Sequence, residues 1–115
     1  MKLLEIQKSK FIGYAYRVDD VKNIEEILLQ QKKEHKKATH ICYAYKIDSG
    51  MEIVKFSDDG EPQGTAGRPM LSVIEKKKLN NVLVVVVRYF GGIKLGANGL
   101  VRAYTKAASL ALGEL

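Results

Sequence analysis

Residues 82–87 read Val-Leu-Val-Val-Val-Val, the longest apolar run in this chain of 115 residues. Most of these side chains are β-branched and none alternates with a polar one, which indicates a strand buried on both faces near the middle of a sheet. The run is too short to span a bilayer, and the amino terminus offers only Leu3-Leu4 before Glu5, so neither a membrane span nor a signal peptide is expected. We therefore expect a cytoplasmic protein.

The neighbouring elements follow from hydrophobic periodicity and from turn residues. In chain order they are a strand from Ser9 to Val18, a helix beginning at Val21 and ending in the basic run 32–37, strands at 40–47 and 51–56, a helix from Pro69 to Lys78, the strand at 82–87 and a last helix from about Asn98. The order βαββαβα predicts a single α+β domain over residues 1–115, with helices packed on a four-stranded sheet. The same pattern is typical of a ferredoxin-like split βαβ sheet.

An acidic glycine-rich loop leads into the helix at Pro69. It carries Asp58, Asp59 and Glu61, whose carboxylates could ligate Mg²⁺ together with a phosphate. Asp-Gly and Glu-Pro are also ordinary turn formers, and a carboxylate here can cap a backbone amide or pair with Arg68. We expect no metal and no cofactor.

The end of this loop, Gly64-Thr65-Ala66-Gly67, has the chemistry of an anion site. It offers free backbone amides at a helix start and the hydroxyl of Thr65, and Arg68 follows for contact with a phosphate. A helix entry that needs unusual dihedral angles explains the same residues equally well. Gly67 is in either case expected to resist replacement, and so is Gly92 further along the chain.

A second glycine-rich segment, residues 88–104, joins the apolar strand to the last helix. Gly91 and Gly96 have the spacing of the first half of a phosphate-binding P-loop, but Ala97-Asn98 stand where that motif needs Lys and Ser or Thr. The chain is therefore not expected to be a P-loop NTPase. Because loops rich in glycine and charge are usually parts of one site, the two segments are expected to meet.

His40 and Cys42 lie two residues apart on an expected strand and so share a face. Residues at this spacing are nearly 7 Å apart along the backbone, too far for a nucleophile and its base, and no catalytic residue is expected. The tyrosines of the Tyr-Ala-Tyr segments share a face with isoleucines. They are either a core face, which the isoleucines favour, or an open platform for stacking bases; these residues are Tyr14, Tyr16, Tyr43 and Tyr45.

Positive charge gathers around the two loops. Nineteen basic residues against thirteen acidic ones give a net charge of +6, which favours nucleic acid or other anionic partners. The residues expected to contact nucleic acid or an anion are Thr65, Gly67, Arg68, Arg88, Gly91, Gly92, Lys94, Arg102 and Lys106. Those expected to organise the site are His40, Asp58, Asp59, Glu61 and Tyr89.

Together with residues 10–15 and 37–45, the two loops resemble the amino-terminal domain of the YigZ/IMPACT family. The resemblance covers nearly the whole chain. It implies a fold like domain 2 of ribosomal protein S5, which several kinases share. Bacterial members usually continue into a second, smaller domain, which this chain is expected to lack. Eukaryotic IMPACT proteins act in translational control by competing for a ribosome-associated activator of a stress kinase.

The resemblance and the charge together favour a noncatalytic domain that associates with RNA or the ribosome in the regulation of translation. Two alternatives stay open. One is a protein-interaction module that binds an acidic partner in translation control, and the other is a small-molecule phosphate-binding enzyme of the kinase-like branch. No membrane partner is expected.

Overall fold

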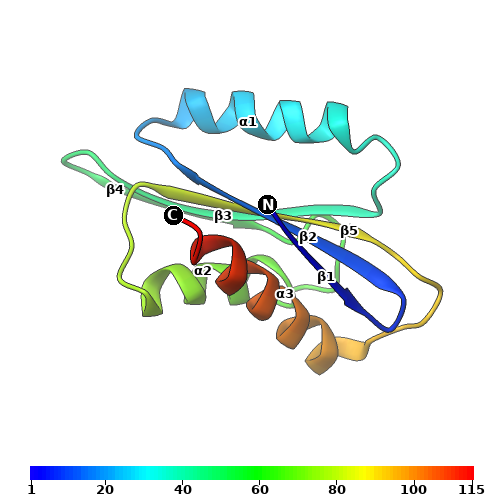
Figure 1. The fold of residues 1–115 in the computed structure, drawn as a ribbon. Helices are drawn as coiled ribbons and strands as arrows, with labels where there is room; N and C mark the ends of the chain where they lie inside the picture. The colour runs from blue at the N-terminus through cyan, green and yellow to red at the C-terminus, as the bar shows by residue number, and fades with distance from the viewer.

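The computed structural model describes residues 1–115 as eight elements around one sheet (Figure 1). They are β1 (Lys2–Ile6), β2 (Ser9–Arg17), α1 (Val21–Glu34), β3 (His40–Asp48), β4 (Glu52–Ser57), α2 (Gly67–Lys76), β5 (Val82–Tyr89) and α3 (Gly96–Leu112). The strand order is β1-β2-β5-β3-β4, and every neighbouring pair is antiparallel. The predicted α+β class and the order of the predicted elements are confirmed.

The prediction of a four-stranded sheet was wrong, because β1 adds a fifth strand at one edge. Leu4 and Ile6 of β1 pack against the main core. The tight turn to β2 is formed by Gln7 and Lys8, with φ of 50° and 67°. Such turns normally carry Asn or Gly, which tolerate positive φ, so this hairpin left no turn signal in the sequence.

The apolar run lies in the central strand, as predicted. β5 pairs with β2 on one side and with β3 on the other, and residues Val82 to Val87 have no exposed surface. Alternation along the strand sends Val82, Val84 and Val86 into a core beneath α2 and α3. The intervening side chains enter a smaller core beneath α1.

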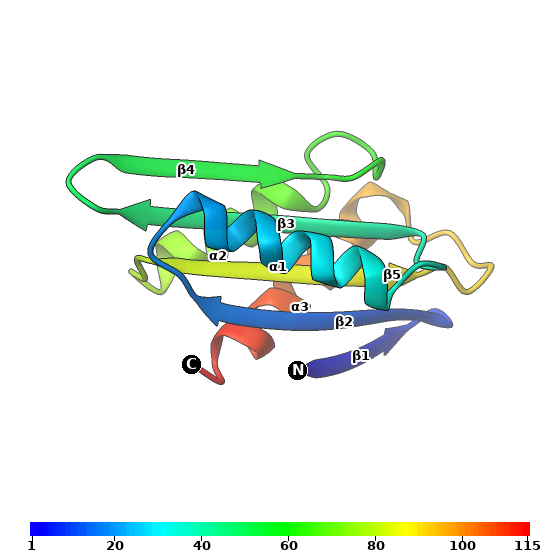
Figure 2. The ribbon, with the colours of Figure 1, turned by 90° about the horizontal axis from the view of Figure 1, so that it is seen from above.

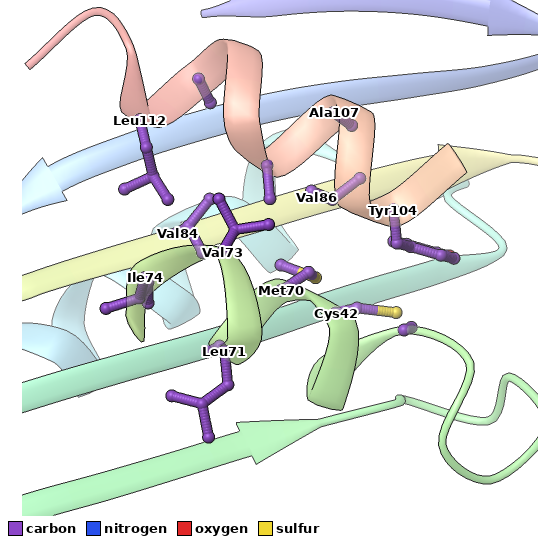
Figure 3. Packing of buried hydrophobic residues seen from close by; sticks show 14 of the residues in the cluster. Cys42, Met70, Leu71, Val73, Ile74, Val84, Val86, Tyr104, Ala107 and Leu112 are labelled. Carbon is purple, nitrogen blue, oxygen red and sulfur yellow. The ribbon is translucent and has the colours of Figure 1, made fainter. Parts of the chain in front are cut away.

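The helices form two layers, one on each face of the sheet. α1 covers one face, and α2 and α3 lie side by side on the other (Figures 1 and 2). Figure 3 shows the larger core, where Met70 and Ile74 of α2 and Ala107 of α3 converge on the sheet. None of the three helices combines the length and the apolar composition needed to span a bilayer.

The two crossover connections have opposite hands. Each connection joins two parallel strands that lie on either side of a third strand. The strands β2 and β3 point opposite to β4 and β5, and the two connections cross the sheet in opposite directions. If both connections had the same hand, their helices would lie on the same face, but α1 and α2 cover opposite faces. In the view of Figure 2, β2-α1-β3 has the usual right-handed sense. The β4-α2-β5 connection is therefore left-handed, which is seen in only about 2% of such connections.

The tyrosine face is a core face, as the isoleucines favoured. α1 covers it, Tyr45 is 5% exposed, and the other tyrosines pack against the same cluster. Tyr14 Oη lies 2.8 Å from His35 Nε2 and Tyr16 Oη accepts a hydrogen bond from Gln31 Nε2 at the edge of α1. Burial raises the pKa of both phenols. The polar tips of these rings are thus occupied within the fold.

Candidate functional site

The carboxylate of Asp58 accepts hydrogen bonds from backbone amides at the start of α2. Its Oδ1 accepts hydrogen bonds from the amides of Ala66 and Gly67 at 3.1 and 2.8 Å, and its Oδ2 accepts one from Gly64 at 2.9 Å. A negative charge is favourable at a helix N-terminus. Of the roles considered for the acidic loop, these contacts match a carboxylate that caps nearby backbone. The three amides already donate to Asp58, so they are not available to an external anion.

These contacts change the acidity of Asp58. Burial by itself raises the pKa of its carboxyl group, but the hydrogen bonds from the amides of Gly64, Gly67 and Ala66 outweigh burial and hold the pKa below the ordinary value of 3.8. The ionised carboxylate is therefore part of the folded loop. Gly67 is confirmed as a position that excludes a side chain, because a Cβ there would lie 2.8 Å from the backbone nitrogen of Ser57.

The substitution Asp58→Asn is expected to lower the free energy of unfolding by roughly 1–2 kcal/mol at neutral pH, because charge-assisted hydrogen bonds are lost. The stability that Asp58 adds over Asn is complete above about pH 4. As pH falls below that value, the carboxyl group is protonated first in the unfolded chain, because its pKa is lower in the folded chain. The added stability is therefore lost as pH falls toward the folded pKa. Urea unfolding of both proteins at neutral pH and near pH 3 measures the difference in their free energies of unfolding. An equal difference between them at the two pH values would contradict this role.

Asp59 ties the acidic loop to the start of β3. Its Oδ2 accepts a hydrogen bond from the amide of Ile41 at 2.6 Å, and its carbonyl oxygen lies 2.7 Å from His40 Nδ1. The second ring nitrogen, His40 Nε2, lies 3.4 Å from Glu61 Oε1. Both ring nitrogens therefore face oxygen acceptors, a setting in which the protonated imidazolium can donate on both sides.

Glu61 and Arg88 form a buried ion pair beneath the loop. Arg88 Nη1 lies 2.8 Å from Glu61 Oε2 and 3.0 Å from Oε1, and the two side chains are 6% and 3% exposed. Tyr104 of α3 donates its hydroxyl to Glu61 Oε2, and Arg88 Nη2 donates to Ser9 Oγ at 3.2 Å. His40 Nε2 lies further away, 3.4 Å from Oε1. Both oxygens of Glu61 therefore already have partners within the fold.

Cys42 lies beneath this network as a buried thiol. Its side chain is fully buried, and Sγ lies 3.1 Å from the carbonyl oxygen of Asp58. Burial raises the pKa of the Cys42 thiol far above its ordinary value, and it raises the pKa of the Tyr104 phenol in the same way. A thiol that stays protonated is a poor nucleophile.

The second glycine-rich segment packs on the turn between β1 and β2. A Cβ at Gly91 would lie 2.0 Å from the carbonyl oxygen of Lys8, so only glycine allows this approach. Gly92 has a φ of 94°, which confirms that it adopts dihedral angles poor for other residues. α3 then begins at Gly96 without a side-chain cap and without an acidic residue in its first turn.

The two segments meet around a cavity of about 400 Å³. Glu61 and Pro62 of the acidic loop form part of the wall, and His40 lies at the start of β3 beside them. The rest of the wall comes from the end of β5 and the start of α3, with Arg88, Phe90, Lys94, Leu95, Gly96, Ala97 and Leu100. The structure thus brings one carboxylate, two basic side chains and several apolar groups from both segments to one place.

The other residues named from the sequence lie apart from this cavity. Lys94 is shared with a second hollow that also contains Arg102 and Lys106. Arg68 lies in a separate hollow, with its guanidinium 5.0 Å from the centre of the Phe56 ring. Tyr89 lies on the α1 face, where its hydroxyl is 2.6 Å from His35 Nδ1. Thr65 donates its hydroxyl to the carbonyl of Pro62 inside the loop.

Sequence reasoning did not assign Ser9 and Tyr104 to the site. Tyr104 falls on the apolar stripe of α3 and is fully buried, and a buried phenol needs an acceptor. That requirement could have pointed to Glu61 or to another carboxylate. Ser9 carried no such signal, because a serine at the start of a strand is ordinary. No group of three or more His, Cys, Asp or Glu side chains is arranged for a metal ion.

Known proteins match this chain over almost its full length. The sequence model of the Impact N-terminal domain matches residues 7–112. The IMPACT family member YvyE of Bacillus subtilis is 50% identical over 110 residues, covering 96% of this chain and 51% of the relative. The IMPACT family member YigZ of Escherichia coli is 41% identical over 113 residues, covering 96% and 55%. The chain thus spans about half the length of these two bacterial relatives.

Two solved structures have a similar fold. One, described as the crystal structure of a hypothetical protein, has a TM-score of 0.93 and 40% identity, covering 99% of this chain and 56% of that one. The other is the two-domain translational regulator Yih1, with a TM-score of 0.59 and 26% identity, covering 95% of this chain and 45% of that one.

A eukaryotic relative is also similar in sequence. Protein IMPACT-B of Xenopus tropicalis is 35% identical over 95 residues, covering 78% of this chain and 29% of the relative.

Proposed function

Because the chain belongs to the IMPACT family through its Impact N-terminal domain, we propose that it acts in the regulation of translation as a noncatalytic domain that binds RNA or the ribosome. The contact surface in this proposal is the hollow that holds Lys94, Arg102 and Lys106, called the basic groove below. The similarity to Yih1, a translational regulator, supports the process. The positive charge of the groove supports an anionic ligand such as RNA.

The observation that carries the proposal is that the cations of the basic groove have no protein partner. Lys94, Arg102 and Lys106 are exposed, and none of them forms an ion pair with a carboxylate. They lie around one hollow of about 220 Å³ between the β1–β2 turn and the start of α3. Unpaired cations along one groove are suited to the phosphates of a nucleic-acid backbone.

Binding of single-stranded RNA is expected to fall steeply with salt. If the three cations neutralise three phosphates, the logarithmic salt slope is about −2, which predicts a roughly 20-fold loss of affinity between about 50 and 200 mM salt. Fluorescence anisotropy with a labelled oligonucleotide measures the slope. A change of less than about twofold over that range would exclude a contact with several phosphates.

A variant with Lys94, Arg102 and Lys106 all replaced by Gln is expected to lose most of this slope. The matched control replaces Lys32, Lys33 and Lys36 by Gln. These lysines are exposed at and just after the end of α1, the helix that lies on the opposite face of the sheet from α3. The net charge falls by the same amount in both variants. Equal losses in the two variants would show that net charge alone drives binding, and the proposed groove would be wrong.

Exposed apolar residues favour a second candidate, a module for a protein partner. Phe90 and Ile93 are 47% and 39% exposed beside Lys94, and such residues can anchor a protein contact. This candidate predicts that binding to purified ribosomes depends weakly on salt and is lost in Ile93→Ser. Binding that Ile93→Ser leaves unchanged would exclude it.

A further inference from the structure

We infer that the surface formed by α2 and α3 binds double-stranded RNA, with α3 lying over the minor groove and a row of cations on each side of it. This inference rests on the proposed function, because the basic groove supplies one of the two rows. It deepens that function by assigning a second row of cations and by naming a duplex as the substrate.

The second row lies on the other side of α3, in a hollow of about 350 Å³ between α2 and α3. Arg68 and Lys76 line this hollow from α2, and Val101 and Thr105 line it from α3. The two cations are eight positions apart on one helix, which places their backbones about 12 Å apart along its axis. Both are exposed, and neither forms an ion pair with a carboxylate. Their charges are therefore available to phosphates.

Positive charge is concentrated on this helical layer. α2 and α3 together carry four basic residues and one acidic residue, Glu75, which lines neither hollow. α1 covers the opposite face of the sheet (Figure 1) and carries three lysines and three glutamates. Charge that served only to keep the protein in solution would not need to differ between the two layers. A face with charge of one sign attracts a polyanion.

The arrangement of the two rows favours a duplex over a single strand. α3 lies between the two hollows, and a helix with its side chains is about 10–12 Å across, so the rows are separated by about that width. A single strand has one line of phosphates, which can follow one row. The minor groove of an RNA duplex is wide and shallow and is bordered by the phosphates of both strands. A duplex can therefore contact both rows at once.

The outward side of α3 suits this groove. Asn98, Arg102, Thr105 and Ser109 recur at the helical period and so share one side of the helix. None of them is buried, and none is a large apolar residue, so they form a low polar ridge between the rows. Their polar groups can exchange hydrogen bonds with the 2′-hydroxyls that line the minor groove of RNA and that DNA lacks.

The test compares three labelled probes by fluorescence anisotropy. They are an RNA duplex of about 16 base pairs, a DNA duplex of the same sequence, and one of the two RNA strands alone. We expect the RNA duplex to bind about tenfold more tightly, or better, than either of the other probes. Contact of five cations with five phosphates predicts a logarithmic salt slope of about −4.5 for the duplex, compared with about −2 for the single strand.

Removing the second row leaves the basic groove in place. We expect Arg68→Gln with Lys76→Gln to weaken duplex binding about tenfold or more and single-strand binding less than about threefold. The matched control, Lys32→Gln with Lys33→Gln on α1, removes the same charge and is expected to weaken either by less than about threefold. Ser72→Glu places a carboxylate between the two α2 cations and is a second variant with the same expected effect on duplex binding. Thermal unfolding checks that each variant is folded.

The outcomes separate this inference from the proposed function. A duplex that binds no more tightly than the single strand would overturn the inference and leave the basic groove in place. Equal binding of the RNA and DNA duplexes would also overturn it, since charge alone would explain the result. So would equal losses in the α2 variant and its α1 control. If neither RNA probe bound, the proposed function and the inference would fail together.

Discussion

Replacing Glu61 by Gln is expected to lower the free energy of unfolding by about 3 kcal/mol, because the guanidinium of Arg88 is then buried without its counter-charge. Arg88 Nη1 lies 2.8 Å from Glu61 Oε2 inside the fold, and Tyr104 donates to the same oxygen. A neutral amide cannot serve both donors as the carboxylate does. Urea unfolding at neutral pH, with equal slopes for the two proteins, measures the loss.

The control is the same substitution in an exposed ion pair. Glu52 lies 3.8 Å from Lys46 Nζ, and its side chain is 58% exposed, so Glu52→Gln is expected to change stability by less than about 0.5 kcal/mol. Adding Arg88→Met to Glu61→Gln removes both charges and is expected to recover much of the loss, since the penalty lies in the unpaired charge. Equal losses for Glu61→Gln and Glu52→Gln would contradict this account.

Replacing Gly91 by Ala is expected to lower the free energy of unfolding by about 3 kcal/mol or more, because the new methyl group collides with backbone rather than with a movable side chain. A Cβ at this position would lie 2.0 Å from the carbonyl oxygen and 2.1 Å from the carbonyl carbon of Lys8. Relief requires the β1–β2 turn to move, which also strains the hydrogen bond from the Gly91 amide to Ser9 Oγ. Thermal and urea unfolding measure the effect.

The neighbouring glycine separates steric collision from backbone strain. Gly92 has a φ of 94°, and a Cβ there would meet no atom within 4 Å. Gly92→Ala is therefore expected to cost only about 1 kcal/mol, the usual cost of a left-handed dihedral angle for a residue with a side chain. If Gly91→Ala were as mild as Gly92→Ala, the close contact with Lys8 would not constrain the loop.

The site could be predicted from the sequence in part. The glycines and charges of the two loops pointed to the segments that line the cavity, because such residues weaken a fold unless a turn or a ligand uses them. The pairing could not be predicted. Glu61 might have met Arg68, close to it in the sequence, yet it meets Arg88, 27 residues away. Which charges become partners depends on where the strands carry them, and spacing along the chain does not contain that information.

The sequence by itself determined the secondary structure around the central strand and the two faces of the sheet. The alternation of Ile12, Tyr14 and Tyr16 and the unbroken run at 82–87 reflect which side chains meet water, and that pattern is local. Only the tertiary structure decided that α2 lies opposite α1 through a left-handed connection, because the apolar stripe of a helix packs equally well on either face of a sheet. It also decided that residues 2–6 form a fifth strand, since an edge strand draws its stability from the hydrogen bonds of its neighbour and needs little pattern of its own.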